Sequence, residues 1–154
     1  ILDQLGVQNV RRARVLLHVG PGTFKPVEVD DVSTHQMDAE FFEVTDAAAE
    51  AVHETGKGGG RVIAVGTTSV RVLESQSEDD GRLRVGSGWT DIFIRPGYRF
   101  KTVDALLTNF HLPKSTLLML VSALAGRDLI REAYAEAVRE KYRFYSYGDC
   151  MLIQ

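Results

Sequence analysis

The sequence predicts an α/β fold with a mostly parallel sheet, flanking helices and one antiparallel hairpin. Apolar segments of strand length recur along the chain, at residues 14–19, 61–65, 105–108 and 150–153. Segments with helical periodicity separate them, and a pair of parallel strands needs a long crossover of this kind. Glycines or polar residues follow three of these strands, an order typical of the ligand-binding loops of α/β proteins.

The amino-terminal part of the chain predicts two helices and an irregular segment. Residues 1–6 resemble the last turns of a helix that Gly6 ends. Residues 24–44 mix short apolar pieces with acidic residues and show no regular period. Thr45 is expected to cap a helix over residues 46–55.

The middle of the chain predicts a strand–loop–helix unit and a hairpin. The second strand leads through the Gly66–Ser69 loop into a helix that ends near Ser75. Residues 82–85 and 89–94 are expected to pair across a glycine turn. Pro96–Gly97 then predicts a type II turn.

Residues 103–125 join an apolar strand, a polar loop and a second apolar segment, and the other elements are expected to pack around them. Residues 105–108 are too short for a helix and predict a buried strand, whereas residues 117–125 predict a buried helix. Pro113 is expected in the first helical turn, and Ser115 is expected to satisfy free N–H groups there.

The carboxyl-terminal part predicts an amphipathic helix over residues 127–141 and a final strand. Glu136 is expected to pair with Arg139 on its outer face. Its inner stripe is expected to hold apolar side chains, namely Ile130, Ala133, Tyr134, Ala137 and Val138.

Length and composition indicate one domain with its own core. The chain has 154 residues, 44% of them apolar, and a formal net charge of −3. No apolar run long enough to span a membrane and no secretory leader are visible, and the single cysteine, Cys150, suits a reducing cytosol. We therefore expect a cytoplasmic protein in which RNA binding depends on a local basic surface.

Polar residues gather after three of the predicted strands. His18 precedes the loop Gly20–Thr23, the loop Gly66–Ser69 opens a helix, and Asn109 and His111 follow the third strand. If these strands are parallel, the three groups converge on one cleft. Each group also has a plainer interpretation, since a core histidine or an ordinary helix cap produces the same pattern.

Two other patterns are rejected as sites. The glycines at residues 56–60 follow a helix and open a strand, which is the reverse of a phosphate-binding loop. His35 with Asp38 and Glu40 lacks a second histidine at ligand spacing, so no metal site is expected.

A basic and aromatic segment follows the Pro96–Gly97 turn. It interleaves Arg95, Tyr98, Arg99, Phe100 and Lys101, a composition that can contact phosphates and stack on bases. More often such a segment is simply a solvated edge.

Five motifs together resemble the S-adenosylmethionine:tRNA ribosyltransferase-isomerase family of queuosine synthesis. The resemblance runs over essentially the whole chain in family order. It rests on HVGPGTF (18–24), GTTSVRVLES (66–75), TDIFIRPGYRF (90–100), LLTNFHLPKSTLLMLVSALAG (106–126) and YRFYSYGDCMLI (142–153).

The resemblance implies an unusual reaction. Members of the family transfer the ribosyl part of S-adenosylmethionine onto 7-aminomethyl-7-deazaguanine at the tRNA wobble position. The group is isomerised to an epoxycyclopentanediol, and adenine and methionine are released. S-adenosylmethionine is thus a consumed substrate, and neither a metal nor a cofactor is expected.

The resemblance also implies roles for individual residues. His18 and His111 would transfer protons, and Asp149 would face an amine or the sulfonium. A second set would bind substrate, namely Gly20, Gly22, Thr23, Gly66, Thr67, Thr68, Ser69, Arg71 and Asn109. A third set would contact RNA, namely Arg95, Tyr98, Arg99 and Lys101.

The family's chains are about twice as long as a single domain. Residues 1–154 are expected to form the carboxyl-terminal part of the large, β/α barrel-like catalytic domain, without the amino-terminal half and its inserted small β-barrel. The expected partners are the modified tRNA, S-adenosylmethionine and that missing half, and no membrane. Tyr145 and Cys150 stand where the family has phenylalanine and alanine, which are mild changes in packing.

Other functions are weighed against this one. The main alternative is a non-catalytic RNA-binding module that uses residues 95–101 and the basic side chains Arg11, Arg12 and Arg14. A hydrolase is disfavoured because no G-x-S-x-G motif occurs. A methyltransferase is disfavoured because GPGTFKP places prolines where a helix should open.

Overall fold

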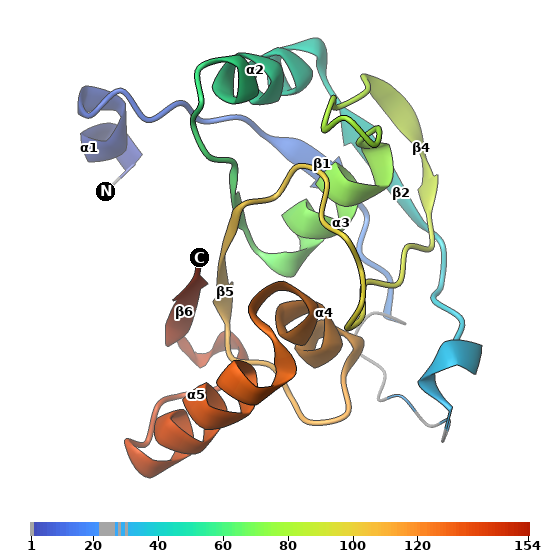
Figure 1. Cartoon of the computed structure of the whole chain (residues 1–154), viewed down its shortest axis with the longest axis vertical. Coiled ribbons are helices and arrows are strands. Elements are labelled where there is room, and N and C mark those ends of the chain that lie inside the picture. The colour runs from blue at the N-terminus through green and yellow to red at the C-terminus, as the bar shows by residue number, and fades with distance from the viewer. Residues whose placement is uncertain (1, 22–26, 28, 30) are drawn as a thin grey trace.

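The computed structural model describes residues 2–21, 27, 29 and 31–154 (Figure 1). These residues form two three-stranded sheets, in the orders β1-β2-β4 and β3-β5-β6. The first sheet joins β1 (Val15–Leu17), β2 (Glu40–Val44) and β4 (Gly86–Thr90), and the second joins β3 (Ile63–Val65), β5 (Ala105–Asn109) and β6 (Cys150–Ile153).

Three of the four strand pairs among the described residues are antiparallel, so the prediction of a mostly parallel sheet is wrong. Among the described residues only β3 and β5 run parallel, with Val65 opposite Leu107. β1 joins β2 rather than β3, and β6 returns antiparallel to β5. The arrangement remains α/β, but no parallel barrel is seen among the described residues.

The predicted hairpin at residues 82–85 and 89–94 is also wrong. β4 pairs with β2, whereas Leu83 makes only an isolated bridge to Ser77. Gly88 is a strand residue opposite Phe42 of β2, and a Cβ atom there would lie 3.2 Å from the ring of Phe42. Gly88, which resembled part of a turn, therefore gives this ring room.

Local signals placed most helices correctly. α2 (Asp46–Lys57) is capped by Thr45, whose Oγ1 accepts a hydrogen bond from the Ala48 N–H at 3.3 Å. α4 (Thr116–Ala125) is capped by Ser115, whose Oγ accepts from the Leu118 N–H at 3.1 Å. Pro113 precedes this helix instead of lying in its first turn, because Ser115 takes the capping position.

The remaining helices complete the arrangement. α1 (Leu2–Val7) and the short η2 (Val32–Thr34) precede β2, and η3 (Tyr145–Tyr147) precedes β6. On α5 (Arg127–Arg139) Ile130 and Ala137 are buried, whereas Val138 is 66% exposed and does not belong to the inner stripe. The predicted Glu136–Arg139 pair is present at 2.5 Å. The Pro96–Gly97 turn is also present, since the Tyr98 N–H donates to the Arg95 carbonyl at 2.9 Å and Gly97 has a φ of 97°.

α3 (Thr67–Gln76) lies at the centre of the molecule and contacts strands of both sheets (Figure 1). Its Val70 and Val72 are fully buried, together with Leu106 of β5 and Val121 of α4. Full burial of side chains of this size stabilises the fold by about 1.5–3 kcal/mol each. The two sheets thus share one core, which α3 fills.

None of the helices within the described residues is both long and apolar enough to cross a bilayer.

Gly66, which begins α3, should not tolerate a side chain. Its φ is 84° and its ψ 145°, a conformation that L residues rarely adopt, although open space surrounds the position of a Cβ atom. Gly66→Ala should therefore lower the free energy of unfolding by about 1–3 kcal/mol through backbone strain alone. Urea titration measures this loss.

Gly56→Ala is the matched control. Gly56 lies within α2 with open space around it, so alanine should leave stability unchanged or raise it by about 0.5–1 kcal/mol. Equal losses for the two variants would contradict the strain argument.

Candidate functional site

α3 carries two buried charged side chains that hold loops on either side of it. Arg71 forms a buried ion pair with Glu40 at the start of β2. The other carboxylate oxygen of Glu40 accepts the Gly20 N–H at 2.7 Å. The helix is therefore joined to the loop that follows β1. Glu40, which was not predicted as a site residue, links Gly20 and Arg71, which were both predicted to bind substrate.

Glu74 holds a second segment, on the other side of α3. Its carboxylate accepts backbone N–H groups from Lys101 at 2.8 Å, Thr102 at 3.1 Å and Val103 at 2.9 Å. The Tyr98 hydroxyl donates to it at 3.2 Å. The segment that leads into β5 is therefore fixed to the central helix.

The carboxyl ends of β3 and β5 form a common edge. The Gly66 N–H donates to the Leu107 carbonyl at 2.8 Å, and Cys150 at the start of β6 lies opposite Asn109. The Asn109 amide donates to the Asp149 carbonyl at 3.2 Å. This edge brings together the loop that opens α3, Asn109 and Asp149, which lie far apart in the sequence.

The amino terminus of α3 opens at this edge. Gly66 occupies the capping position, and no side chain caps the helix there. Thr67 is buried, and the Ser69 hydroxyl donates back to the Val65 carbonyl at 2.8 Å. Backbone N–H groups at such a helix start favour an anion or a polar ligand oxygen.

Asp149 is held by a forked ion pair. Its carboxylate accepts the Arg143 backbone N–H at 2.5 Å and the guanidinium Nη2 at 3.0 Å. These hydrogen bonds from Arg143 hold the pKa of Asp149 below its usual range. The carboxylate therefore remains ionised and fixed in orientation.

His111 is buried behind the edge. Its Nε2 lies 3.1 Å from the Thr108 hydroxyl, and its backbone N–H donates to the Tyr134 hydroxyl at 2.7 Å. Burial lowers the pKa of His111 from its usual 6.5 to about 4. The ring is accordingly neutral near pH 7.

His18 directly follows β1 of the other sheet and is exposed. Its ring centroid is 5.5 Å from that of Phe41, which in turn lies 5.8 Å from Trp89. Trp89 is 71% exposed, so the three rings form an open aromatic row across β1, β2 and β4. The first sheet therefore presents an imidazole beside a surface on which a flat ligand can stack.

The residues predicted to contact RNA have different surroundings. Arg95 and Arg99 are exposed. Tyr98 is half-buried against Phe100, and burial raises the pKa of its hydroxyl. The Lys101 amine donates to the Ser77 carbonyl at 3.2 Å and lies 3.0 Å from Asp79.

One cavity reaches the end of β3 at Val65, and another lies away from the common edge. The first, of about 410 Å³, is bounded by β1, α2 and β3, and its wall includes Ser69 together with Arg11 and Arg14. The other, of about 680 Å³, lies between α4 and α5. His18, Asn109 and His111 line neither of them.

Two predicted substrate-binding residues, Gly22 and Thr23, fall outside the described residues. The described residues contain no group of three His, Cys, Asp or Glu side chains placed to hold a metal ion.

Sequence reasoning missed Glu40 as a structural partner, although a signal exists. Every second residue of β2 is buried, namely Glu40, Phe42 and Val44. Glu40 therefore lies on the face of the strand that points into the core. A carboxylate at such a position requires a cation, and Arg71 lies among the buried residues of α3.

The comparisons with known proteins agree over nearly the whole chain. The family model described as queuosine biosynthesis protein matches residues 1–153. A protein of Symbiobacterium thermophilum named S-adenosylmethionine:tRNA ribosyltransferase-isomerase is 63% identical over 153 residues, which are 99% of this chain and 45% of the relative. One of the same name from Cupriavidus pinatubonensis is 60% identical, over 99% of this chain and 44% of the relative.

A solved structure agrees with the fold. The crystal structure titled S-adenosylmethionine tRNA ribosyltransferase from Thermotoga maritima matches with a TM-score of 0.80 and 44% identity, over 99% of this chain and 48% of that chain. The chain therefore spans less than half the length of the relatives that it matches.

The depressed pKa of His111 predicts a pH dependence of stability. Between pH 6.5 and about 4 the unfolded chain binds a proton at this histidine whereas the folded chain does not, so the free energy of unfolding falls as pH falls. The loss from this residue should reach about 2–3 kcal/mol near pH 4. Urea titrations at pH 7, 6 and 5 should show a flatter profile for His111→Gln than for the unmodified chain.

His53→Gln controls for the removal of an imidazole, because His53 is exposed on α2. Its profile should match that of the unmodified chain. If His111→Gln kept the full slope, the buried neutral imidazole would not be its source.

The Arg71–Glu40 pair predicts a large energetic effect. Arg71→Met leaves the Glu40 carboxylate buried without this partner, and the expected loss is about 3–5 kcal/mol of unfolding free energy. The double variant Glu40→Gln/Arg71→Met should recover part of it, which chemical denaturation measures as a coupling energy. Arg82→Gln, which removes an exposed pair with Glu78, should change stability little. Additive losses in the double variant would contradict the coupling.

Proposed function

The chain belongs to the queuosine biosynthesis protein family, and we propose that it forms the carboxyl-terminal catalytic part of an S-adenosylmethionine:tRNA ribosyltransferase-isomerase. The observation that carries this proposal is the common edge, where Gly66, Asn109 and Asp149 meet although they lie far apart in the sequence. The names of two similar relatives support it.

The proposed reaction transfers the ribosyl part of S-adenosylmethionine to the aminomethyl nitrogen of 7-aminomethyl-7-deazaguanine in tRNA. The product is epoxyqueuosine, and adenine and methionine are released. This chemistry requires a base for a proton next to the sulfonium, groups that hold the departing adenine, and a neutral attacking amine.

The common edge is proposed to bind the ribose and methionine parts of the substrate. Backbone N–H groups of Thr67 and Thr68 at the start of α3 suit a carboxylate or a ribose oxygen, since the helix lacks a side-chain cap. Asn109 is exposed at the end of β5 and can orient a hydroxyl group. The ionised carboxylate of Asp149, fixed by Arg143, suits the cationic sulfonium or ammonium group.

Of the two predicted proton-transfer groups, His18 is the more accessible. His111 has a pKa of about 4 and both its ring and its backbone N–H are engaged, so it accepts a proton poorly near pH 7. His18 is exposed beside an aromatic row that could hold adenine by stacking. We assign proton removal to His18, and to His111 the positioning of the segment after β5.

The rest of the catalytic domain is proposed to come from the part of the relatives that this chain does not match. That part is more than half of their length. In this proposal residues 2–154 supply the edge, the aromatic row and a surface for tRNA, and the matching upstream part completes the domain.

Release of free adenine tests the proposal. Chromatography should detect adenine after S-adenosylmethionine is mixed with tRNA that carries 7-aminomethyl-7-deazaguanine, and none with unmodified tRNA. The assay uses this chain alone and joined to the upstream part of the Symbiobacterium thermophilum relative. Absence of adenine in both arms would overturn the proposal, and RNA binding without turnover would favour a non-catalytic module.

His18 can be tested in whichever form is active. His18→Gln should lower the rate of adenine release about 100- to 10,000-fold, the range that a general base contributes. His53→Gln should leave the rate unchanged. A rate that survives His18→Gln would remove His18 from the mechanism.

A further inference from the structure

The larger cavity is a groove between two helix faces. On α4 and its cap it is lined by Ser115, Leu118 and Ser122, and on α5 by Arg127, Ile130 and Tyr134. The positions on each helix share one face. Its volume is about 680 Å³, which lies within the range of ligand sites. The turn at Arg95–Pro96 and Lys114 bound its far side.

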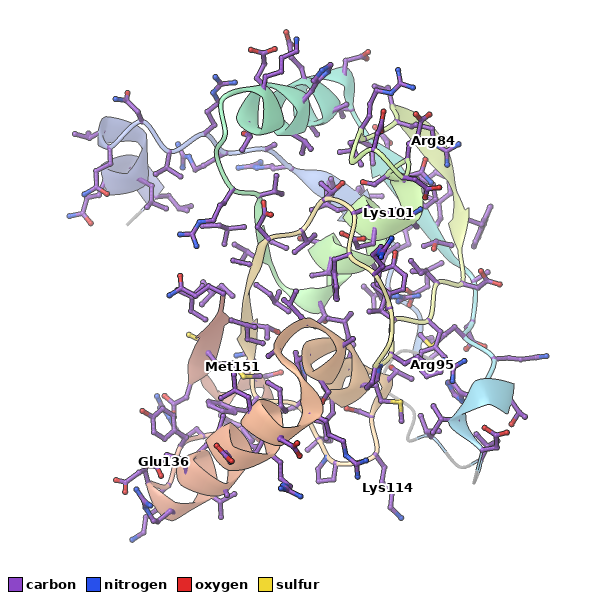
Figure 2. All side chains as sticks on the ribbon, viewed as in Figure 1. Arg84, Arg95, Lys101, Lys114, Glu136 and Met151 are labelled. Atoms are coloured by element: carbon purple, nitrogen blue, oxygen red, sulfur yellow. The ribbon has the colours of Figure 1, made fainter. Side chains whose placement is uncertain are left out.

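Four cationic side chains surround this groove, namely Arg95, Lys114, Arg127 and Arg131. All four are exposed, and the described residues that line the groove include no carboxylate. Asp128 lies 3.6 Å from Arg131 on the solvent side of α5. Figure 2 shows Arg95 and Lys114 on the same side of α4. A local excess of positive charge therefore stands on a chain whose net charge is −3.

The backbone adds to this charge. α4 begins after Ser115, beside Lys114, so the positive end of its dipole adds to the charge at that end of the groove. At the other end α5 begins at Arg127 directly after α4 ends at Ala125, so the two opposite dipole ends offset one another there. Arg127 and Arg131 are one helical turn apart, about 5–6 Å between their Cβ atoms. Two guanidinium groups at this separation can each contact one of two neighbouring phosphates.

The floor of the groove is apolar. Leu118, Met119 and Ile130 line it, together with the ring of Tyr134. Tyr134 is fixed, because its hydroxyl accepts the His111 N–H and its ring lies 5.4 Å from that of Phe110. A rigid apolar floor below a cationic rim suits a ligand with flat bases and a charged backbone.

We propose that this groove binds the phosphate backbone of RNA, with a base on the apolar floor. The inference rests on the proposed function, in which tRNA is a substrate. It adds Lys114, Arg127 and Arg131 to the RNA-contacting residues and joins Arg95 to them in one site.

The charge of the groove disfavours the other substrate. S-adenosylmethionine carries a sulfonium and an ammonium group against one carboxylate, so its net charge is positive. Four cations in a groove without a carboxylate among its described lining residues repel such a ligand and attract a polyanion.

Fluorescence anisotropy with an unmodified tRNA transcript tests the groove without any turnover. Arg127→Gln/Arg131→Gln should weaken binding roughly tenfold at low salt. The slope of log K against log salt should become shallower by about 0.7 for each phosphate that these side chains no longer neutralise. Arg139→Gln/Lys141→Gln removes two cations near the other end of α5, outside the groove, and should change neither quantity.

Further variants keep the test decisive. Arg127→Lys/Arg131→Lys retains the charge and should keep most of the affinity, which separates loss of charge from loss of folding. Equal weakening by the two glutamine pairs, or no RNA binding by the unmodified chain, would overturn the inference. Displacement of the tRNA by adenosine monophosphate at equal concentration would also overturn it, since a small phosphorylated ligand would then be the occupant.

The two proposals fail in different ways. Adenine release with no specific effect of Arg127 and Arg131 on RNA binding would contradict the groove alone. A specific effect without adenine release, from this chain or from its fusion to the upstream part of the relative, would contradict the proposed reaction alone.

Discussion

The fold depends on two charges that α3 carries into the interior. Arg71 and Glu74 are one helical turn apart and are both buried, yet they point to different partners. Arg71 meets Glu40 and thereby the loop after β1, whereas Glu74 gathers the N–H groups that precede β5. A buried charge is costly unless it is paired or hydrogen-bonded. Only one position of α3 relative to the two sheets gives both Arg71 and Glu74 their partners.

This constraint explains how a chain with two small sheets shares one core. Each sheet has only three short strands, and α3 contacts strands of both. α3 supplies the common apolar surface through Val70 and Val72, and the paired charges set its orientation. The open start of the helix is consequently presented at the edge beside Asn109, so the positions of the site groups follow from the same contacts.

Local features were predictable from the sequence and long-range pairings were not. Thr45 and Ser115 were identified as helix caps because a cap depends on residues within one turn. The pairing of β2 with β4 depends on Phe42 fitting over Gly88, which no local pattern reveals. The same limit applies to the site: Gly66 and Asn109 could be placed together from one parallel pair, whereas His18 lies on a separate sheet.

Tyr134 contacts both the groove and the segment that follows β5. Its ring forms part of the groove between α4 and α5, and its hydroxyl holds the backbone of His111 just after β5. A ligand that moves this ring must also move that hydrogen bond, and a change at the end of β5 must alter the floor of the groove. The coupling free energy between the groove and the edge is the same in both directions. Binding in the groove therefore shifts the conformation of the edge by as much as a change at the edge shifts binding in the groove.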